Sequence, residues 1–411
     1  MVQPEFHVVI FGATSFIGQI LSRYLLRRHG ACGEFRWAIA GRSETKLKGL
    51  RAELGTDAAN LPFFVVDAAD EPTLRALCTR THVVCSTVGP FALYGSTLVK
   101  VCAELGTDYC DISGEFQWIA RMIAEHEATA KKSGARIVHC CGFDSIPSDI
   151  GVHFLQQQAR QHHGQPCTRV NLRIKYVHGN LSGGTIASLI HAVKEAVHDP
   201  AVRKLMSNPY AICPGQGTGG AKRPIITMPD FDPDARSWLA PFIMAATNVH
   251  VVHRTNALSG FAYGREFVYD EALMAGSGLK GRARALAISG GLGGLIFAVA
   301  FPPTRVLLEK FVLPKPGQGP SPQQQEKGSY DFRFFGHTAN GKIVRTKVTG
   351  DRDPGYGSTA KMLGEAAACL ALDVPKAEKP GGFWTPATMF GDRLVSRLIA
   401  HAGLKFEAHP L

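Results

Sequence analysis

Short apolar segments alternate with helical patterns through about the first 150 residues, and this alternation constrains the fold more than any other feature. Runs rich in Val, Ile and Phe are typical of strands buried on both faces of a sheet. Parallel strands need crossover helices, so the alternation predicts a doubly wound parallel sheet in an α/β domain over 1–150. The strands are predicted at 6–11, 35–40, 62–66, 82–88, 107–111 and 135–140, and the helices at 16–29, 43–54, 70–78, 95–105 and 116–132.

The rhythm changes after Asp149, where we predict a second α+β domain over 151–355 on a mainly antiparallel sheet. The segment VNLRIKYVHG (170–179) alternates like a strand, and Asn340-Gly341 between two alternating runs predicts a type I′ hairpin. Residues 314–328 are of low complexity and predict a loop or linker. Residues 356–411, with helices at 358–372 and 388–402, are predicted to pack back on the first domain.

A glycine fingerprint, GATSFIG (12–18), joins the first predicted strand to the first helix. Gly12 would permit the sharp turn and Gly18 close packing of helix on strand, which leaves backbone N–H groups to receive a pyrophosphate. Ser15 keeps this geometry if its φ stays ordinary, and its hydroxyl can itself reach a phosphate. The simpler alternative is a tight turn without a ligand. The place of the motif at the head of a βαβ series favours a Rossmann-type dinucleotide site.

The end of the second strand, AGRSETKL (40–47), indicates which dinucleotide. No carboxylate precedes Glu44 where an NAD site would place one for the ribose 2′-hydroxyl. Arg42 can instead hold a 2′-phosphate, with Ser43 donating a hydroxyl and Lys46 one turn further on. The alternative is a surface arginine with no ligand. We predict NADPH as the cofactor.

Other strand ends supply the remaining candidates. Asp67 follows the third strand, where a side chain lies beside the adenine, although it could simply cap the next helix. The turn from Thr87 to Pro90 follows the fourth strand and is expected near the nicotinamide ribose. The predicted cofactor-binding residues are Gly12, Ala13, Thr14, Ser15, Phe16, Ile17, Gly18, Arg42, Ser43, Lys46, Asp67, Thr87, Val88, Gly89 and Pro90.

Candidate catalytic residues are Tyr94, Asp111 and Asp144. Tyr94 could place a phenol near the reacting centre, and the alternative is that it is only packed in the fold. The clusters YCDISGE (109–115) and CCGFDSIPSD (140–149) could form polar walls of a substrate pocket at strand ends. The alternative is that Ser148 or Asp149 is only an N-cap and Glu115 only a first-turn carboxylate.

Composition excludes several other classes. The net charge of +11 suits nucleic acid, an anionic membrane or a phosphorylated ligand, but no zinc-finger, RNP-like or long basic motif is present, so we expect no nucleic-acid partner. Ten cysteines without a CxxC pair indicate reduced thiols in the cytoplasm. The histidines lack metal-ligand spacing, so no metal site is predicted, and His162-His163 is expected in a solvated loop. Because a strand begins at once, no secretory signal is expected.

The segments GATSFIG, AGRSETKL, STVGPFALYG, YCDISGE and CGFDSIPSDIG together resemble the saccharopine dehydrogenase-like oxidoreductase family, and 381–407 is similar to its tail. This family includes bacterial proteins called trans-acting enoyl reductases. The resemblance implies a Rossmann NADP-binding domain with its cradle at 12–18, Arg42 and 87–90, and a second α+β domain. The middle section departs from saccharopine-forming enzymes, so the trans-acting branch implies reduction of a carbon–carbon double bond in a lipid or polyketide chain.

One apolar stretch, ALAISGGLGGLIFAVAFPPT (285–304), runs without a charge between basic flanks. The first interpretation is a buried helix. The second is a monotopic membrane contact or an acyl-chain tunnel, favoured by Lys280, Arg282, Arg284 and Arg305 if the segment is exposed. A membrane span is the third, although its four glycines weaken a helix and a lone span would divide the two domains.

The sequence therefore leaves three hypotheses for the function. The first is an NADPH-dependent oxidoreductase, enoyl reductase-like, acting on a small-molecule or lipid-like substrate, with peripheral membrane contact through 285–304 and a homodimer as further expectations. The second is a saccharopine-type amino-acid dehydrogenase, for which Arg169, Arg173 and Lys175 could bind carboxylates, unless they are the solvated face of a strand. The third is a non-catalytic Rossmann-scaffold protein at lipid surfaces.

Overall fold

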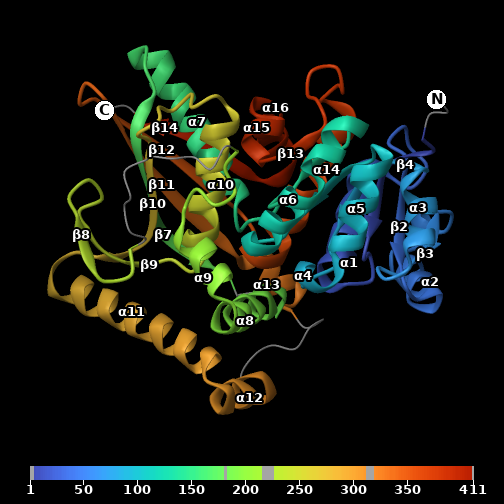
Figure 1. Ribbon diagram of the computed structural model, residues 1–411, viewed down its shortest axis with the longest axis horizontal. Coiled ribbons are helices and arrows are strands. Elements are labelled where there is room, and N and C mark those ends of the chain that lie inside the picture. Colours follow the sequence, from blue (N-terminus) through green and yellow to red (C-terminus); the bar gives the residue numbers. More distant parts are fainter. Residues whose placement is uncertain (1–3, 180–182, 215–225, 312–318, 410–411) are drawn as a thin grey trace. The chain divides into compact units, whose positions relative to one another are not determined.

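The computed structural model describes residues 4–179, 183–214, 226–311 and 319–409 (Figure 1). The chain forms two compact units. The first contains residues 1–143, 317–319 and 356–402, and the second contains 144–316, 320–355 and 403–411.

The first unit is built on a seven-stranded sheet in the order β13-β6-β5-β4-β1-β2-β3. Every neighbouring pair in it is parallel, which confirms the predicted doubly wound sheet. The strands are β1 (Phe6–Phe11), β2 (Trp37–Gly41), β3 (Phe63–Val65), β4 (Thr81–Ser86), β5 (Asp108–Asp111), β6 (Arg136–Val138) and β13 (Gly382–Trp384). The seventh strand, β13, comes from the C-terminal part of the chain and was not predicted.

Helices cover this sheet in two groups. Helices α1 and α14 pack on one another and on β1, while α3, α5 and α6 form a second contacting group. Their apolar side chains are buried at helical spacing, as at Leu21 and Leu25 of α1. The helices of this unit are α1 (Phe16–His29), α2 (Glu44–Glu53), α3 (Glu71–Cys78), α4 (Phe91–Tyr94), α5 (Ser96–Leu105), α6 (Phe116–Ser133), α14 (Thr359–Leu372), α15 (Pro386–Phe390) and α16 (Asp392–Arg397).

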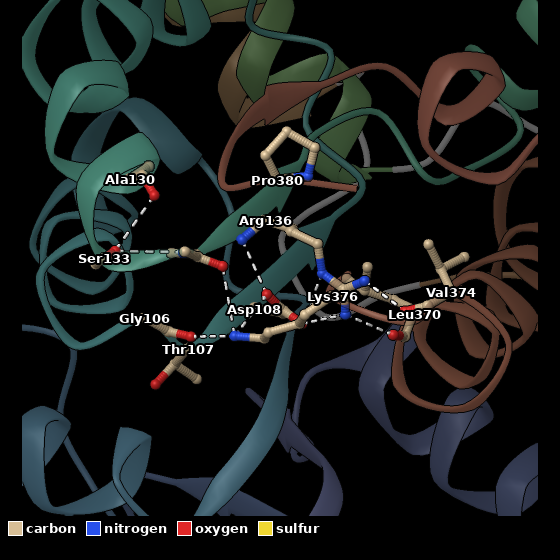
Figure 2. Close-up of polar contacts among 12 residues, drawn as sticks. Gly106, Thr107, Asp108, Ala130, Ser133, Arg136, Leu370, Val374, Lys376 and Pro380 are labelled. Atoms are coloured by element: carbon tan, nitrogen blue, oxygen red, sulfur yellow. Dashed lines mark hydrogen bonds and ion pairs between the residues drawn. The ribbon is translucent and has the colours of Figure 1, made fainter. Parts of the chain in front are cut away.

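A buried ion pair ties the C-terminal segment to the edge of this sheet (Figure 2). Arg136, which is 3% exposed, donates from Nε to Asp108 Oδ2 at 3.0 Å. The same guanidinium donates to the carbonyl oxygens of Leu370, at 3.0 Å, and Val374. Because buried charge must be paired and hydrogen-bonded, these contacts fix the return of the chain beside β6, where β13 then adds to the sheet.

The second unit is built on a sheet in the order β14-β12-β11-β7-β10-β9-β8. Among the described strands of this sheet only β10 and β7 pair in parallel, so the predicted mainly antiparallel sheet is confirmed. Its strands are β7 (Cys167–His178), β8 (Asp230–Asp232), β9 (Ser237–Pro241), β10 (Val268–Gly276), β11 (Ser329–Thr338), β12 (Ile343–Gly350) and β14 (Leu404–His409). Its helices are α7 (Ile146–His163), α8 (Gly183–His198), α9 (Pro200–Ser207), α10 (Ala245–Leu258), α11 (Gly278–Ala300), α12 (Pro302–Phe311) and α13 (Pro322–Lys327).

The predicted hairpin joins β11 to β12, but its turn is not type I′. Thr338 N–H donates to Lys342 O at 2.9 Å, which leaves a three-residue loop. Gly341 has a φ of +81°, whereas Asn340 is not among the described non-glycine residues with positive φ. A type I′ turn needs positive φ at both central residues, so this is the longer hairpin with glycine in the left-handed position.

Three local predictions are wrong. His162 and His163 end helix α7 instead of lying in a loop. Residues 322–327, within the predicted linker, form α13, because Ser321 and Gln324 make a capping box; residues 312–318 lie outside the described residues. The last predicted helix, 388–402, is interrupted at Gly391, whose φ is +52°.

The apolar stretch is helical but mostly exposed. Only Gly281, Ala285 and Val299 of α11 are buried, so the interpretation as a buried helix is wrong. By length and composition α11 could cross a membrane, which by itself is weak evidence.

Candidate active site

The glycine fingerprint forms a tight turn between β1 and α1. Gly12 has a φ of +87°, and a Cβ there would lie 2.5 Å from Val88 Cγ2. A Cβ on Gly18 would lie 2.3 Å from Gly12 O, so both glycines are needed for the close approach. Ser15 has an ordinary φ of −69° and is the N-cap of α1, its Oγ accepting from Gly18 N–H at 3.0 Å. Serine therefore replaces a glycine here without backbone strain.

This turn leaves polar groups for an anion. In the part of the chain that the structure describes, the backbone N–H groups of Phe16 and Ile17 have no hydrogen-bond partner. They open a 14-residue helix, whose N-terminus attracts negative charge. Ala13 and Ile17 are buried, while Thr14 and Phe16 are half-buried beside them. The arrangement has the shape and the free donors that a pyrophosphate requires.

The turn after β4 is tied to the glycine turn. Thr87 Oγ1 donates to Gly12 O at 2.9 Å and lies 3.0 Å from Ser15 Oγ. Gly89 is exposed, and it precedes Pro90 in the loop that leads into α4. The structure thus brings the predicted pyrophosphate and nicotinamide-side residues together at the carboxyl ends of adjacent strands β1 and β4, the position at which open α/β sheets bind ligands.

The residues after β2 carry uncompensated positive charge. Arg42 and Lys46 are exposed, and neither has a carboxylate partner among the described residues, whereas Lys48 pairs with Glu44 at 2.7 Å. Ser43 is the N-cap of α2 and accepts from Lys46 N–H at 3.4 Å, which leaves its own proton free to donate. Two cations and a helix N-terminus make a site suited to a phosphate.

Asp67 makes a local turn. Its Oδ1 accepts from Ala69 N–H at 2.9 Å, and the side chain is exposed. The N-cap of α3 is Asp70 instead. A contact with adenine remains a prediction.

The three candidate catalytic residues lie in different environments. Tyr94, at the end of α4, is 49% exposed. Asp111 is fully buried, and it accepts from Tyr109 OH at 3.0 Å, from Ser113 N–H at 3.0 Å and from Cys140 N–H at 3.2 Å. Asp144 begins the second unit; it is half-buried, and loss of hydration raises its pKa to about 6.

Sequence reasoning missed the partner of Asp111. His139 Nδ1 lies 2.7 Å from Asp111 Oδ2, and the buried imidazole contacts the rings of Trp118 and Phe383. The next residue, Cys140, has a φ of +64°, which is rare for a side chain other than glycine. The only signal in the sequence is that Asp111 and His139 both lie at the end of a predicted strand, and no metal-ligand spacing marks this histidine.

Glu115 is not an ordinary first-turn carboxylate, because it is the N-cap residue of α6. It is buried, and its oxygens accept from the backbone N–H groups of Phe91 at 2.8 Å and Ala92 at 3.1 Å. These bonds satisfy the first donors of α4, so Glu115 positions the loop that follows Pro90. Negative charge at a helix N-terminus also stabilises it.

At the end of the second cluster, Ser148 and Asp149 are buried in the interior of the second unit, whereas residues 140–143 belong to the first unit. Ser148 Oγ accepts from Asn248 Nδ2 at 3.1 Å, and the same amide nitrogen lies 3.0 Å from Glu271 Oε2. Asp149 Oδ1 accepts from Thr255 at 2.5 Å. The N-cap of α7 is Ser145, so the N-cap interpretation of Ser148 and Asp149 is wrong. Burial raises the pKa of Glu271 to about 7.

The basic residues of β7 are all paired with carboxylates. Arg173 is buried against Asp232, at 2.5 Å, and Asp270, so it is not on a solvated face. Arg169 lies 3.8 Å from Asp234, and Lys175 lies 3.9 Å from Asp331. Arg173 is thus neutralised within the unit, which counts against a saccharopine-type amino-acid site that uses this residue. Among the described residues no group of three His, Cys, Asp or Glu side chains could hold a metal ion.

Comparison with known proteins agrees with this geometry. Residues 8–138 match the saccharopine dehydrogenase NADP binding domain family. A Mycobacterium tuberculosis protein whose name places it among the trans-acting enoyl reductases is 39% identical, over 98% of this chain and 97% of its own. A trans-acting enoyl reductase of Mycobacterium bovis is 36% identical, over 96% of each chain. This chain belongs to the saccharopine dehydrogenase-like, trans-acting enoyl reductase family.

A saccharopine dehydrogenase from Saccharomyces cerevisiae has the same fold, with a TM-score of 0.53 at 12% identity over 98% of this chain and 100% of that one. At that identity the likeness describes the fold alone. As a member of this family, the chain is an NADP-dependent oxidoreductase, which confirms the predicted cofactor and class of enzyme.

Proposed function

We propose that this oxidoreductase reduces a carbon–carbon double bond in the acyl chain of a lipid or polyketide-type substrate. The observation that carries the proposal is a dinucleotide cradle on a chain that matches proteins named trans-acting enoyl reductases over nearly its whole length. The pairing of every basic residue at 169, 173 and 175 with a carboxylate supports an apolar substrate over an amino acid.

NADPH, when bound, supplies the hydride that one alkene carbon receives, and the neighbouring carbon must receive a proton. The dinucleotide would be held by residues 12–18, Arg42 and residues 87–90, and Asp67 would lie beside the adenine. Asp144 is our first candidate for the proton donor, because a carboxyl with a pKa of about 6 is partly protonated near neutral pH. Tyr94 is the second. Asp111 accepts hydrogen bonds on both oxygens, which suits it to orient His139 and the turn after β5.

The test uses purified protein, NADPH deuterated at C4 and an α,β-unsaturated acyl thioester of medium length. We expect consumption of NADPH and one deuterium on the β-carbon of the saturated product. Asp144→Asn should slow single-turnover reduction by about 100-fold, the usual contribution of a general acid, while the affinity for NADPH stays unchanged. NADPH binding without reduction of any unsaturated thioester, together with turnover of an amino acid and an oxo acid, would refute the proposal.

The place of action is part of the same proposal. A lipid-like substrate is met at a membrane, so we propose a cytoplasmic protein with peripheral membrane contact through 285–304, a segment that is mostly exposed. The homodimer stays a prediction, which sedimentation of the purified chain would test.

A further inference from the structure

Helix α11 presents an apolar face to solvent. Leu279 is 84% exposed, Leu286 52% and Phe297 71%. Eighteen residues make about five helical turns and seven make about two, so these three side chains lie in one row along the helix. Phe301, 50% exposed, follows at its end and stacks on Phe297 with ring centroids 6.4 Å apart. Contiguous exposed apolar surface of this kind marks an interaction site.

The opposite side of α11 packs on the second unit, where the helix contacts β9 and β10; Figure 1 shows α11 beginning next to β9. Ala285 is buried with Ala240 and Ala275, and Trp238 packs against this cluster. A Cβ on Gly281 would lie 2.1 Å from Gly276 O, so the first turns of the helix approach the backbone as closely as glycine permits. The helix also contacts α8. The exposed row therefore points away from the side of α11 that carries its buried residues, Gly281, Ala285 and Val299.

Basic residues flank this row. Lys280 and Arg284 are exposed near the start of the helix, and Arg282, also exposed, stacks over Trp238 with its guanidinium carbon 5.4 Å from the ring centroid. No Asp or Glu occurs between residues 272 and 308. An apolar row with positive flanks is the pattern of a helix that lies in the interface of an anionic membrane, with its apolar side chains among the acyl chains and its cations at the headgroups.

We propose that α11 binds anionic membrane surfaces while lying in the membrane plane, with Leu279, Leu286 and Phe297 inserted. The helix does not cross the bilayer, because its first turns would have to leave β9 and expose the buried cluster at Ala240 and Ala275. This inference rests on the proposed function for its purpose, which is to bring the enzyme to an acyl substrate. The binding itself requires neither NADPH nor turnover, so the two can fail separately.

The test is flotation of the purified full-length chain with vesicles of phosphatidylcholine alone or of phosphatidylcholine with phosphatidylglycerol. We expect the chain to float only with the anionic vesicles and to be released by high salt, since screening weakens attraction to the headgroups. The double variant Leu286→Gln/Phe297→Gln should bind at least about tenfold more weakly, because it loses the burial of two large apolar side chains. Lys280→Gln/Arg284→Gln should lose about fivefold for each charge.

The matched control is Met228→Gln, which changes a side chain 68% exposed on the same unit but outside α11. It should float like the unaltered chain. All variants should keep the melting temperature and the NADPH affinity of the unaltered chain, which shows that they fold.

Flotation of the Leu286→Gln/Phe297→Gln variant equal to that of the control overturns the proposal. So does an unaltered chain that binds no vesicle. If this variant instead converts a dimer to a monomer in solution, the apolar row belongs to a second copy of the chain and the membrane assignment is wrong. Membrane binding that persists with salt and resists alkaline extraction would indicate a span and would also refute it. Reduction of a soluble short-chain thioester, measured without vesicles, tests the proposed function independently.

Discussion

Replacing Arg42 by alanine should change which nucleotide this protein prefers. Arg42 is exposed after β2, and no carboxylate among the described residues neutralises it. Ser43 and Lys46 lie beside it at the start of α2, where the helix dipole also favours an anion. The 2′-phosphate is the group that NADPH has and NADH lacks, so removal of this guanidinium should weaken NADPH alone.

The size of the effect follows from the exposure of the site. A hydrogen bond to a charged group contributes about 1.5–3 kcal/mol, and solvent screening at an exposed position places Arg42 near the lower limit. We therefore expect NADPH to bind about tenfold more weakly to Arg42→Ala, with NADH changed by less than about twofold. Lys46 remains in the variant and retains part of the attraction, so Arg42→Ala/Lys46→Ala should lose a further several-fold.

The assay is a fluorescence titration with each reduced nucleotide at low and moderate salt. The control is Lys48→Ala on the same helix, because Lys48 already pairs with Glu44 at 2.7 Å and should not bind the phosphate. The NADPH affinity of the unaltered chain should fall with salt more steeply than that of the variant. Equal losses of NADPH and NADH in Arg42→Ala, or an equal loss in the control, would refute the assignment of the 2′-phosphate.

Three further outcomes test the structure. Gly12→Ala should abolish nucleotide binding and cost at least about 1–2 kcal/mol of stability, because φ is +87° and the new methyl would meet Val88, as titration and thermal melting can measure. Arg173→Met should lower the free energy of unfolding by about 3–5 kcal/mol, because it removes the cation that faces two buried carboxylates; denaturation that matches the unaltered chain would contradict the ion cluster. The pKa of Glu271 is raised from 4.5 to about 7, so the folded protein holds this proton more tightly than the unfolded chain does. The protonated carboxyl therefore stabilises the fold at low pH, and this contribution is lost as the pH rises from 4.5 to about 7. Melting curves of Glu271→Gln should lack this loss.

The parallel sheet and the nucleotide turn could be predicted because their signals are local. Apolar runs between helical patterns specify buried parallel strands. Gly12 and Gly18 are needed because a Cβ at either position would clash, and both glycines lie within one seven-residue motif. The strand β13 could not be predicted in the same way. Its place depends on Arg136, which reaches Val374 across 238 positions of the chain, and no pattern within a short window encodes that contact.

The surroundings of the polar clusters could not be predicted from the sequence. The clusters 109–115 and 140–149 are predicted as pocket walls because both follow strands, yet Glu115 and Asp149 are buried and hydrogen-bonded within their own units. The sequence tells where a strand ends but not whether the side chain there faces a cavity or a neighbouring helix. The interpretation of α11 as a buried helix is wrong for a related reason, because apolar composition alone does not show whether another element covers a helix.

The distribution of unpaired positive charge argues for the function more strongly than any single motif. In the second unit Arg173 meets two buried carboxylates, so this guanidinium is already bound by the protein's own acids and is not available to an amino acid. In the first unit Arg42 and Lys46 have no such partner among the described residues, and they lie where the phosphate that distinguishes NADPH is expected. A chain that keeps Arg42 and Lys46 available for the cofactor, while Arg173 is bound by its own carboxylates, is suited to an apolar substrate. The Arg42 titration and the thioester assay therefore test two consequences of one arrangement.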